Sequence, residues 1–92
     1  MLKRYGNQRD ANEPEIVRAL EQAGCSVIRL NTPADLLVGR TTPQGKRTYL
    51  IEVKSANGTL TRDQDTFTDL WRGQFSVVRS VEDALIAVGV AI

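Results

Sequence analysis

The first part of the chain has apolar residues at helical spacing, which predict an amphipathic helix over residues 12–23. Asn12 stands at the expected N-cap, Pro14 lies in the first turn, and Gly24 follows the end. These residue types start and stop helices because they suit the backbone geometry and hydrogen bonding of helix ends. The apolar stripe consists of Ile16, Ala19, Leu20 and Ala23.

Three shorter runs with the composition of β-strands come next, over residues 26–30, 35–38 and 48–54. The segment 43–46, Pro-Gln-Gly-Lys, separates the second run from the third. Proline and glycine at these positions are typical of a tight turn. The second and third runs are therefore expected to form a hairpin.

The second half of the chain predicts a helix, a strand and a final helix. Thr61 is the expected cap of a helix over residues 61–72. A strand over residues 75–79 follows, and Ser80 has the character of a cap for the last helix. Three side chains of the middle helix are expected to face the core: Phe67, Leu70 and Trp71.

The resulting order, α-β-β-β-α-β-α, predicts an α/β fold with a small mixed sheet flanked by helices. The 92 residues suffice for one domain, over residues 1–92, and 41% hydrophobic with 25% charged residues is an ordinary globular composition. A domain this small buries only about 60% of its unfolded surface. We therefore expect a partner, most simply a second copy.

Two surfaces are candidates for contact between copies. The final segment is strongly apolar, and one helical face cannot bury all of Leu85, Ile86, Val88, Val90 and Ile92. Trp71 and Phe75 are interpreted as core or subunit contacts rather than base-stacking surfaces. The apolar final segment predicts a homodimer.

The cysteine and histidine counts exclude several kinds of site. The chain has one cysteine and no histidine, so it has no internal disulfide and no zinc set of Cys and His. Ser-His and Cys-His catalysis and haem ligation by histidine are excluded as well. Cys25 is expected to be a small buried hydrophobe.

The chain ends predict location and partners. The apolar run over residues 84–92 is too short to cross a bilayer, so no membrane association is expected. Residues 1–10 are polar and basic, without the apolar stretch of a secretory signal, so we expect a cytoplasmic protein. The net charge of +1 does not decide for or against nucleic acid. A basic arm of Lys3, Arg4, Tyr5 and Arg9 is a candidate for binding phosphates.

The candidate chemistry lies in the hairpin. Glu52 and Lys54 share one face of the third strand because side chains alternate along a strand. If the hairpin sets Asp35 opposite Glu52, two carboxylates converge beside an ammonium group. Two carboxylates suit a hard divalent cation such as Mg²⁺, which activates a water and neutralises charge on a phosphate. This pattern indicates phosphodiester hydrolysis.

Pro33-Ala34-Asp35, then sixteen residues, then Glu52-Val53-Lys54 resembles the signature of the PD-(D/E)XK nuclease superfamily. The predicted element order is similar to its restriction-endonuclease-like α-β-β-β-α-β core. More narrowly, the chain resembles small VRR-NUC proteins of phages and bacteria from about Asp10 to Leu85. The segments that are similar are residues 10–17, 35–38, 51–54, 60–64 and 76–79.

The resemblance implies a role for each matching residue. Asp35 and Glu52 would bind Mg²⁺ or Mn²⁺, Val53 would add its carbonyl, and Lys54 would be the catalytic lysine. Gln64 matches a glutamine on the helix after the motif.

The family also has a functional glutamate on its first helix, and two residues match it. Glu13 stands eleven residues before Gly24, as in archaeal Holliday-junction resolvases, and is favoured. Glu15 better matches the Glu-Ile-Val pattern of phage relatives and is kept.

The resemblance implies a metal-dependent, structure-selective DNA endonuclease, bacterial or phage-encoded, that cuts four-way junctions as a homodimer. One alternative is a nuclease for flaps, nicks or single strands. Another is a catalytically silent DNA-binding dimerisation module.

Overall fold

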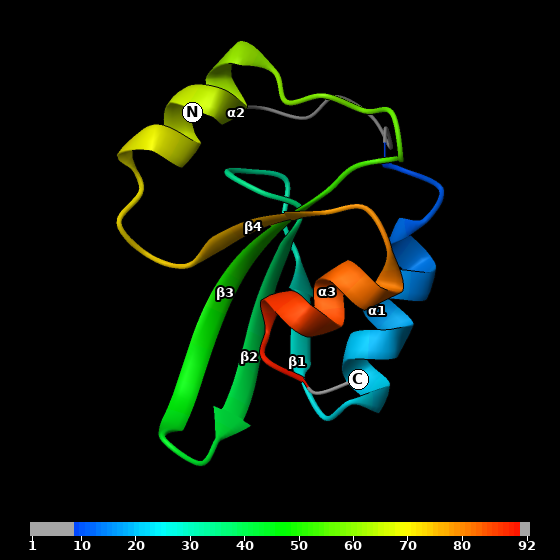
Figure 1. Ribbon diagram of the computed structural model, residues 1–92, viewed down its shortest axis with the longest axis vertical. Helices are drawn as coiled ribbons and strands as arrows, with labels where there is room; N and C mark the ends of the chain where they lie inside the picture. Colours follow the sequence, from blue (N-terminus) through cyan, green and yellow to red (C-terminus); the bar gives the residue numbers. More distant parts are fainter. Residues whose placement is uncertain (1–8, 91–92) are drawn as a thin grey trace.

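The computed structural model describes residues 9–90 as one sheet with three helices (Figure 1). Lys3, Arg4, Tyr5 and Ile92 lie outside the described residues. The elements are α1 (Glu13–Gln22), β1 (Ser26–Arg29), β2 (Leu36–Thr42), β3 (Gly45–Val53), α2 (Arg62–Leu70), β4 (Phe75–Val78) and α3 (Val81–Ala87). The predicted element order is confirmed.

The sheet has the strand order β1-β2-β3-β4. The first three strands are antiparallel, whereas β4 runs parallel to β3. A parallel pair needs a crossover connection, and α2 is part of the connection between these two strands. The predicted α/β class with a small mixed sheet is confirmed, and β3 is a central strand.

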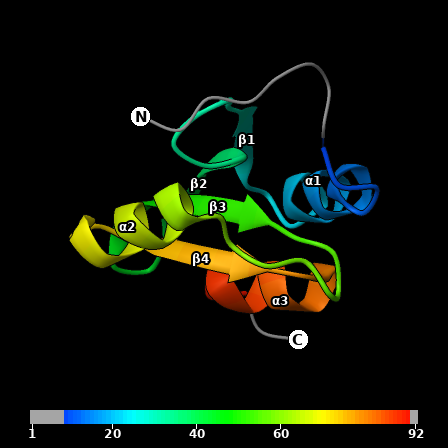
Figure 2. The same cartoon turned by 90° about the horizontal axis from the view of Figure 1, so that it is seen from above.

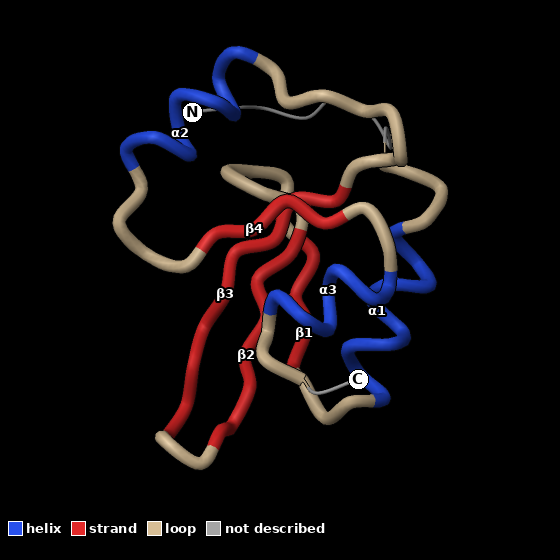
Figure 3. The backbone as a smooth tube through the Cα atoms, in the orientation of Figure 1, coloured by secondary structure: helices blue, strands red, loops and turns tan. Residues whose placement is uncertain are grey.

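The β2–β3 hairpin is longer than expected. Its pairing extends from Leu36 opposite Ile51 to Thr42 opposite Gly45, so it closes on a two-residue turn. The prediction ended β2 at Val38 because polar residues follow, but backbone pairing does not require apolar side chains. The hairpin consequently projects beyond the rest of the sheet (Figure 3).

α1 starts and ends where the sequence predicts, but its cap works differently. The Asn12 side chain makes no capping hydrogen bond to α1. Its Nδ2 instead donates to the carbonyl oxygens of Lys54 and Arg79, each at 3.2 Å, which ties the start of α1 to the ends of β3 and β4. At the other end, Gly24 has φ of +93°, a conformation that glycine adopts without strain.

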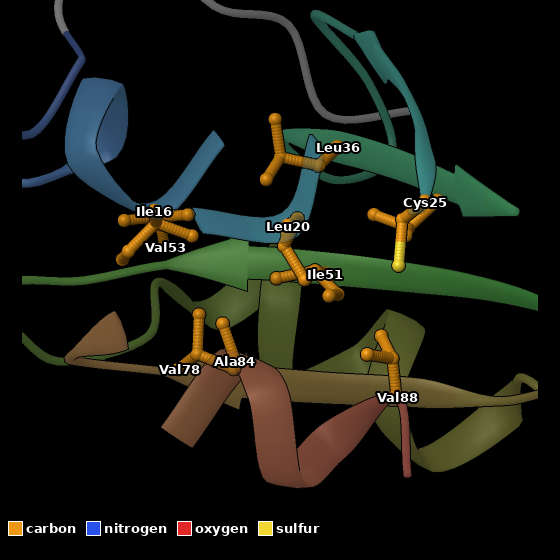
Figure 4. Packing of buried hydrophobic residues seen from close by; sticks show 10 residues of the cluster. Ile16, Leu20, Cys25, Leu36, Ile51, Val53, Val78, Ala84 and Val88 are labelled. Atoms are coloured by element: carbon orange, nitrogen blue, oxygen red, sulfur yellow. The ribbon is translucent and has the colours of Figure 1, made fainter. Parts of the chain in front are cut away.

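One face of the sheet packs against α1 and α3 (Figure 4). Ile16 and Leu20 are fully buried, as expected for the stripe of α1, whereas Ala19 is half-buried and Ala23 exposed. Cys25 is buried, which confirms its expected place. The other core members are Leu36, Val38, Ile51, Val53, Val78, Ala84 and Val88. This layer is the hydrophobic core.

α2 lies apart from α1 and α3 (Figures 1 and 2), and its predicted burial is wrong. Leu70 is 74% exposed and Trp71 46% exposed, while Phe67 is half-buried. The reason is that α2 lies on the face of the sheet opposite to α1 and α3, away from the hydrophobic core. The only residue of α2 that is buried there is the polar Gln64. Periodicity identified the helix but not the depth of its packing.

The final segment is better covered than expected. Val88 is fully buried, and Leu85 and Val90 pack against the core cluster. Ile86 is 59% exposed. The largest apolar exposure is therefore at α2. Across residues 9–90, none of the helices has the length and apolar character needed to cross a membrane.

Candidate active site

The hairpin register brings Asp35 across from Glu52, because Leu36 pairs with Ile51 and the next positions face each other. Both carboxylates are 1% exposed. The amide of Asp35 donates to the carbonyl of Ile51 at 3.1 Å. The amide of Val53 donates to Asp35 Oδ2 at 2.8 Å, so the backbone of β3 orients this carboxylate. Two buried acids thus lie next to each other at one end of the hairpin.

Glu52 is held from two sides. Gln64 Nε2 donates to Glu52 Oε2 at 2.7 Å, and Lys54 Nζ lies 3.5 Å from the same oxygen. Gln64 is itself oriented by a capping box. Its side-chain Oε1 accepts a hydrogen bond from the backbone N–H of Thr61, and its backbone N–H donates to Thr61 Oγ1. The first turn of α2 therefore orients Gln64, and Gln64 in turn positions the carboxylate of Glu52 on β3.

Glu13, on the first turn of α1, joins this end of the molecule. It is 1% exposed, and its Oε2 lies 2.8 Å from Arg9 Nη1 and 3.4 Å from Arg29 Nε. Arg9 Nη1 is also 3.9 Å from Asp35 Oδ1, and its Nη2 donates to the carbonyl of Leu30 at 2.6 Å. One guanidinium group thus links two of the predicted site acids.

Glu15 is exposed on α1, so the structure does not bring it to the other site residues. The side chain of Val53 is buried in the core, and its amide orients Asp35. The predicted site residues that lie together are Glu13, Asp35, Glu52, Lys54 and Gln64.

Two arginines differ from the sequence prediction. Arg9 was expected in a phosphate-binding arm, yet its guanidinium contacts Glu13 and is only partly exposed. Arg29 was not singled out. Arg29 on β1 pairs with Leu36 on β2, the residue after Asp35. Its place on the strand next to Asp35 could have identified it as a candidate site residue.

The carboxylates of Glu13, Asp35 and Glu52 meet some of the requirements of a site for a hard divalent cation. Glu13 Oε1 is buried and accepts no hydrogen bond within residues 9–90, an unusual state for a carboxylate oxygen. Over the same residues, no three Cys, Asp or Glu side chains are grouped closely enough to share a metal ion. Mg²⁺ commonly takes one or two protein carboxylates and keeps several waters, so Asp35 and Glu52 would be enough to hold it.

Comparisons with protein-family models, with curated proteins and with solved structures give no match to this chain. The resemblance to VRR-NUC proteins therefore stays a prediction from the motif residues. The assignment of chemistry depends on the site geometry.

Proposed function

We propose that this chain is a divalent-metal-dependent DNA endonuclease that hydrolyses phosphodiester bonds with Mg²⁺ or Mn²⁺. The main support is the arrangement of Asp35, Glu52 and Lys54. Buried acids are costly unless a cation or hydrogen bonds compensate them, and here two lie next to each other, with the ammonium group of Lys54 3.5 Å from Glu52.

Each side chain has a defined task in this proposal. Asp35 and Glu52 would hold a divalent metal ion, whose chemistry there would be to activate a water and to neutralise charge on the phosphate. Lys54, 3.5 Å from Glu52, orients the attacking water and stabilises the negative charge of the transition state. Gln64 keeps Glu52 in one rotamer through its 2.7 Å hydrogen bond. Val53 keeps Asp35 in place through its amide.

The proposed substrate is branched DNA, in particular a four-way junction, and the proposed active form is a homodimer in the bacterial or phage-infected cytoplasm. A chain of 92 residues has little room for elements that read base edges, so DNA shape would select the substrate. A two-fold protein matches a two-fold junction. Flaps, nicks and single strands are the rival substrates within the same class.

A second candidate function is a catalytically silent DNA-binding dimerisation module. The observation that favours it is the absence, within residues 9–90, of three clustered acidic or cysteine ligands. Arg9 also engages Glu13 at 2.8 Å, as a structural ion pair would.

The deciding experiment uses labelled duplex, flap and four-way-junction DNA with and without Mg²⁺ or Mn²⁺. We expect metal-dependent cleavage, lost in Asp35→Ala and Glu52→Ala, with Mg²⁺ raising the melting temperature of the wild type. Glu15→Ala is the matched control because Glu15 is exposed, and Glu13→Ala tests the other candidate. Cleavage by Asp35→Ala in chelator-treated buffer would contradict the proposal.

Lys54→Ala separates catalysis from binding. We expect the single-turnover rate to fall by about a hundredfold or more, while DNA affinity measured in Ca²⁺ changes little. A loss of affinity with an unchanged rate at saturation would assign Lys54 to substrate binding instead.

A further inference from the structure

A groove with a volume of about 690 Å³ lies between the β2–β3 hairpin and the segment that follows α2. Leu37 and Leu50, which pair across the hairpin, line it from the sheet, and Trp71 lines it from the C-cap of α2. Both leucines lie outside the core cluster that α1 and α3 cover. We call this surface the Trp71 groove.

Trp71 is held in place beside the groove. Its ring stacks on Phe67 with centroids 5.4 Å apart and planes at 20°, and Phe67 in turn meets the edge of Phe75. A Cβ atom on residue 73 would lie 2.6 Å from Trp71 Nε1, so Gly73 leaves the space that the indole occupies. Trp71 is nevertheless 46% exposed. A flat ring that its neighbours fix and that solvent still reaches is suited to stacking on a flat group of a ligand.

The charged side chains that line the Trp71 groove are all basic. They are Lys46, Arg47 and Arg72, and all three are exposed. Among the described residues, no acidic side chain lines the groove. No ion pair within residues 9–90 involves the three basic residues either. Three positive charges around one groove favour an anionic ligand.

The acidic residues of α2 point away from the groove. α2 faces the sheet with its buried Gln64, whereas Asp63, Asp65 and Asp69 are exposed. At 3.6 residues per turn, the three aspartates lie about 100° to 140° around the helix axis from Gln64. Trp71, seven residues after Gln64, lies only about 20° from it. The indole and the aspartates are therefore on different sides of the helix.

A single strand of nucleic acid matches this lining. Each nucleotide has one flat base and one phosphate, and the groove provides an indole ring, two leucines and three cations. Proteins that bind single strands combine a basic groove with aromatic side chains on which bases stack. Paired bases stack on each other in a duplex, so a base that reaches Trp71 has to be unpaired. An acidic peptide would supply the negative charges but no flat base for the indole.

The Trp71 groove adjoins the candidate active site. Because side chains alternate along a strand, Leu37 shares a face of the sheet with Asp35, and Leu50 shares it with Glu52. Two residues along a strand span about 7 Å. A nucleic-acid strand in the groove would therefore lie next to the candidate metal ligands.

We propose that the Trp71 groove binds an unpaired strand of DNA, with one base stacked on Trp71 and the flanking phosphates at the three basic residues. This binding is independent of base sequence, because the lining contacts base faces and phosphates. It requires no metal ion. One consequence rests on the proposed function: the groove places an unpaired strand at a DNA branch beside the candidate active site.

The first test uses Trp71, the single tryptophan of the chain, as a reporter. In chelator-treated buffer, a short oligothymidylate should quench the tryptophan emission until the site is saturated, because a base then stacks on the indole. Trp71→Phe should keep most of the affinity for a labelled oligothymidylate, and Trp71→Ala should lose about tenfold or more. Equal affinities of the wild type and Trp71→Ala would overturn the proposal. Quenching by poly-glutamate but not by the oligonucleotide would assign the groove to an acidic peptide instead.

The second test counts the phosphate contacts from the dependence of affinity on salt. For single strands, the slope of log K against log salt concentration is about −0.7 for each phosphate contact, so three contacts predict a slope of about −2. Lys46→Gln, Arg47→Gln and Arg72→Gln should each reduce its magnitude by about 0.7. These residues are exposed, so the variants keep the fold, and Arg18→Gln on the exposed side of α1 is the control. Wild-type slopes in all three variants would contradict the proposal.

The groove and the nuclease fail separately. On DNA with an unpaired strand at a branch, Trp71→Ala should raise the DNA concentration for half-maximal single-turnover rate about tenfold, with the rate at saturation changed by about threefold or less. The predicted quenching and salt slopes without cleavage in any metal would overturn the nuclease and leave the groove. Cleavage without quenching, at the same DNA concentrations in Trp71→Ala as in the wild type, would overturn the groove alone.

Discussion

The two faces of the sheet differ in what they bury. On one face, α1 and α3 close an apolar layer that includes Leu20, Ile51 and Val88, all 0% exposed. On the other face, α2 buries only Gln64 and leaves Leu70 and Trp71 in solvent. The first face holds the fold together through apolar burial, worth about 25 cal/mol per Å².

This difference indicates a division of labour. A domain of 92 residues has apolar material for one well-packed layer, so most of its stability must come from the α1 and α3 side. The α2 side can then hold polar, buried groups such as Glu52 and an uncovered apolar rim. Functional sites commonly occupy the less stable parts of a structure.

The largest contrast is expected between two leucines. Leu20→Ala should lower the free energy of unfolding by about 2–5 kcal/mol, because it leaves a cavity in the core. Leu70→Ala should change it by about 0.5 kcal/mol or less in the monomer, since Leu70 is already exposed. Denaturant unfolding under dilute conditions measures both, and equal losses would show that α2 is part of the stable core.

The next effect concerns the boundary between the two faces. Arg9→Gln should cost about 1–3 kcal/mol in metal-free buffer, because buried Glu13 loses its closest donor. The same variant should bind Mn²⁺ more tightly than the wild type, since Arg9 no longer competes for Glu13 and Asp35. Electron paramagnetic resonance titration measures the affinity. Arg18→Gln is the control, and an unchanged Mn²⁺ affinity in Arg9→Gln would show that Arg9 and the metal do not compete.

The helix caps give a matched pair on the two sides. Ser80 caps α3 by accepting from the amide of Asp83, and Thr61 caps α2 by accepting from the amide of Gln64. Ser80→Ala should cost about 1 kcal/mol of global stability. Thr61→Ala should have a smaller global effect and instead speed hydrogen exchange within α2, because that helix opens locally. Mass spectrometry of exchanging amides distinguishes the outcomes, and equal global losses would argue against local opening.

The smallest effect is a pH dependence at the core. Burial raises the pKa of the Cys25 thiol, and the positive charge of Arg40 lowers it in part. The folded protein therefore keeps this proton to a higher pH than the unfolded chain does. The resulting stability is fully present below the unfolded pKa of about 8.5 and is lost as the pH rises through the folded pKa. Cys25→Ala should flatten this decline between pH 7 and pH 10 in denaturant titrations, and an unaltered slope would assign it to other groups.

The amino-acid sequence by itself determined the order of elements and the local geometry of the motif. Helix periodicity and end residues located α1 and the cap of α2, and strand alternation placed Glu52 and Lys54 on one side of β3. These features depend on interactions between residues close in the chain. They could be predicted without knowing which helices and strands pack against each other.

Only the tertiary structure showed that Glu13 is buried and Glu15 is exposed, because both residues suit the first turn of a helix. It also moved Arg9 from a predicted phosphate-binding arm to the carboxylates. The same is true of Trp71, whose apolar character predicted burial although the sheet leaves it half exposed. Helical periodicity indicates the face that an element can bury, but the amount of surface available on its neighbours decides how much of that face is covered.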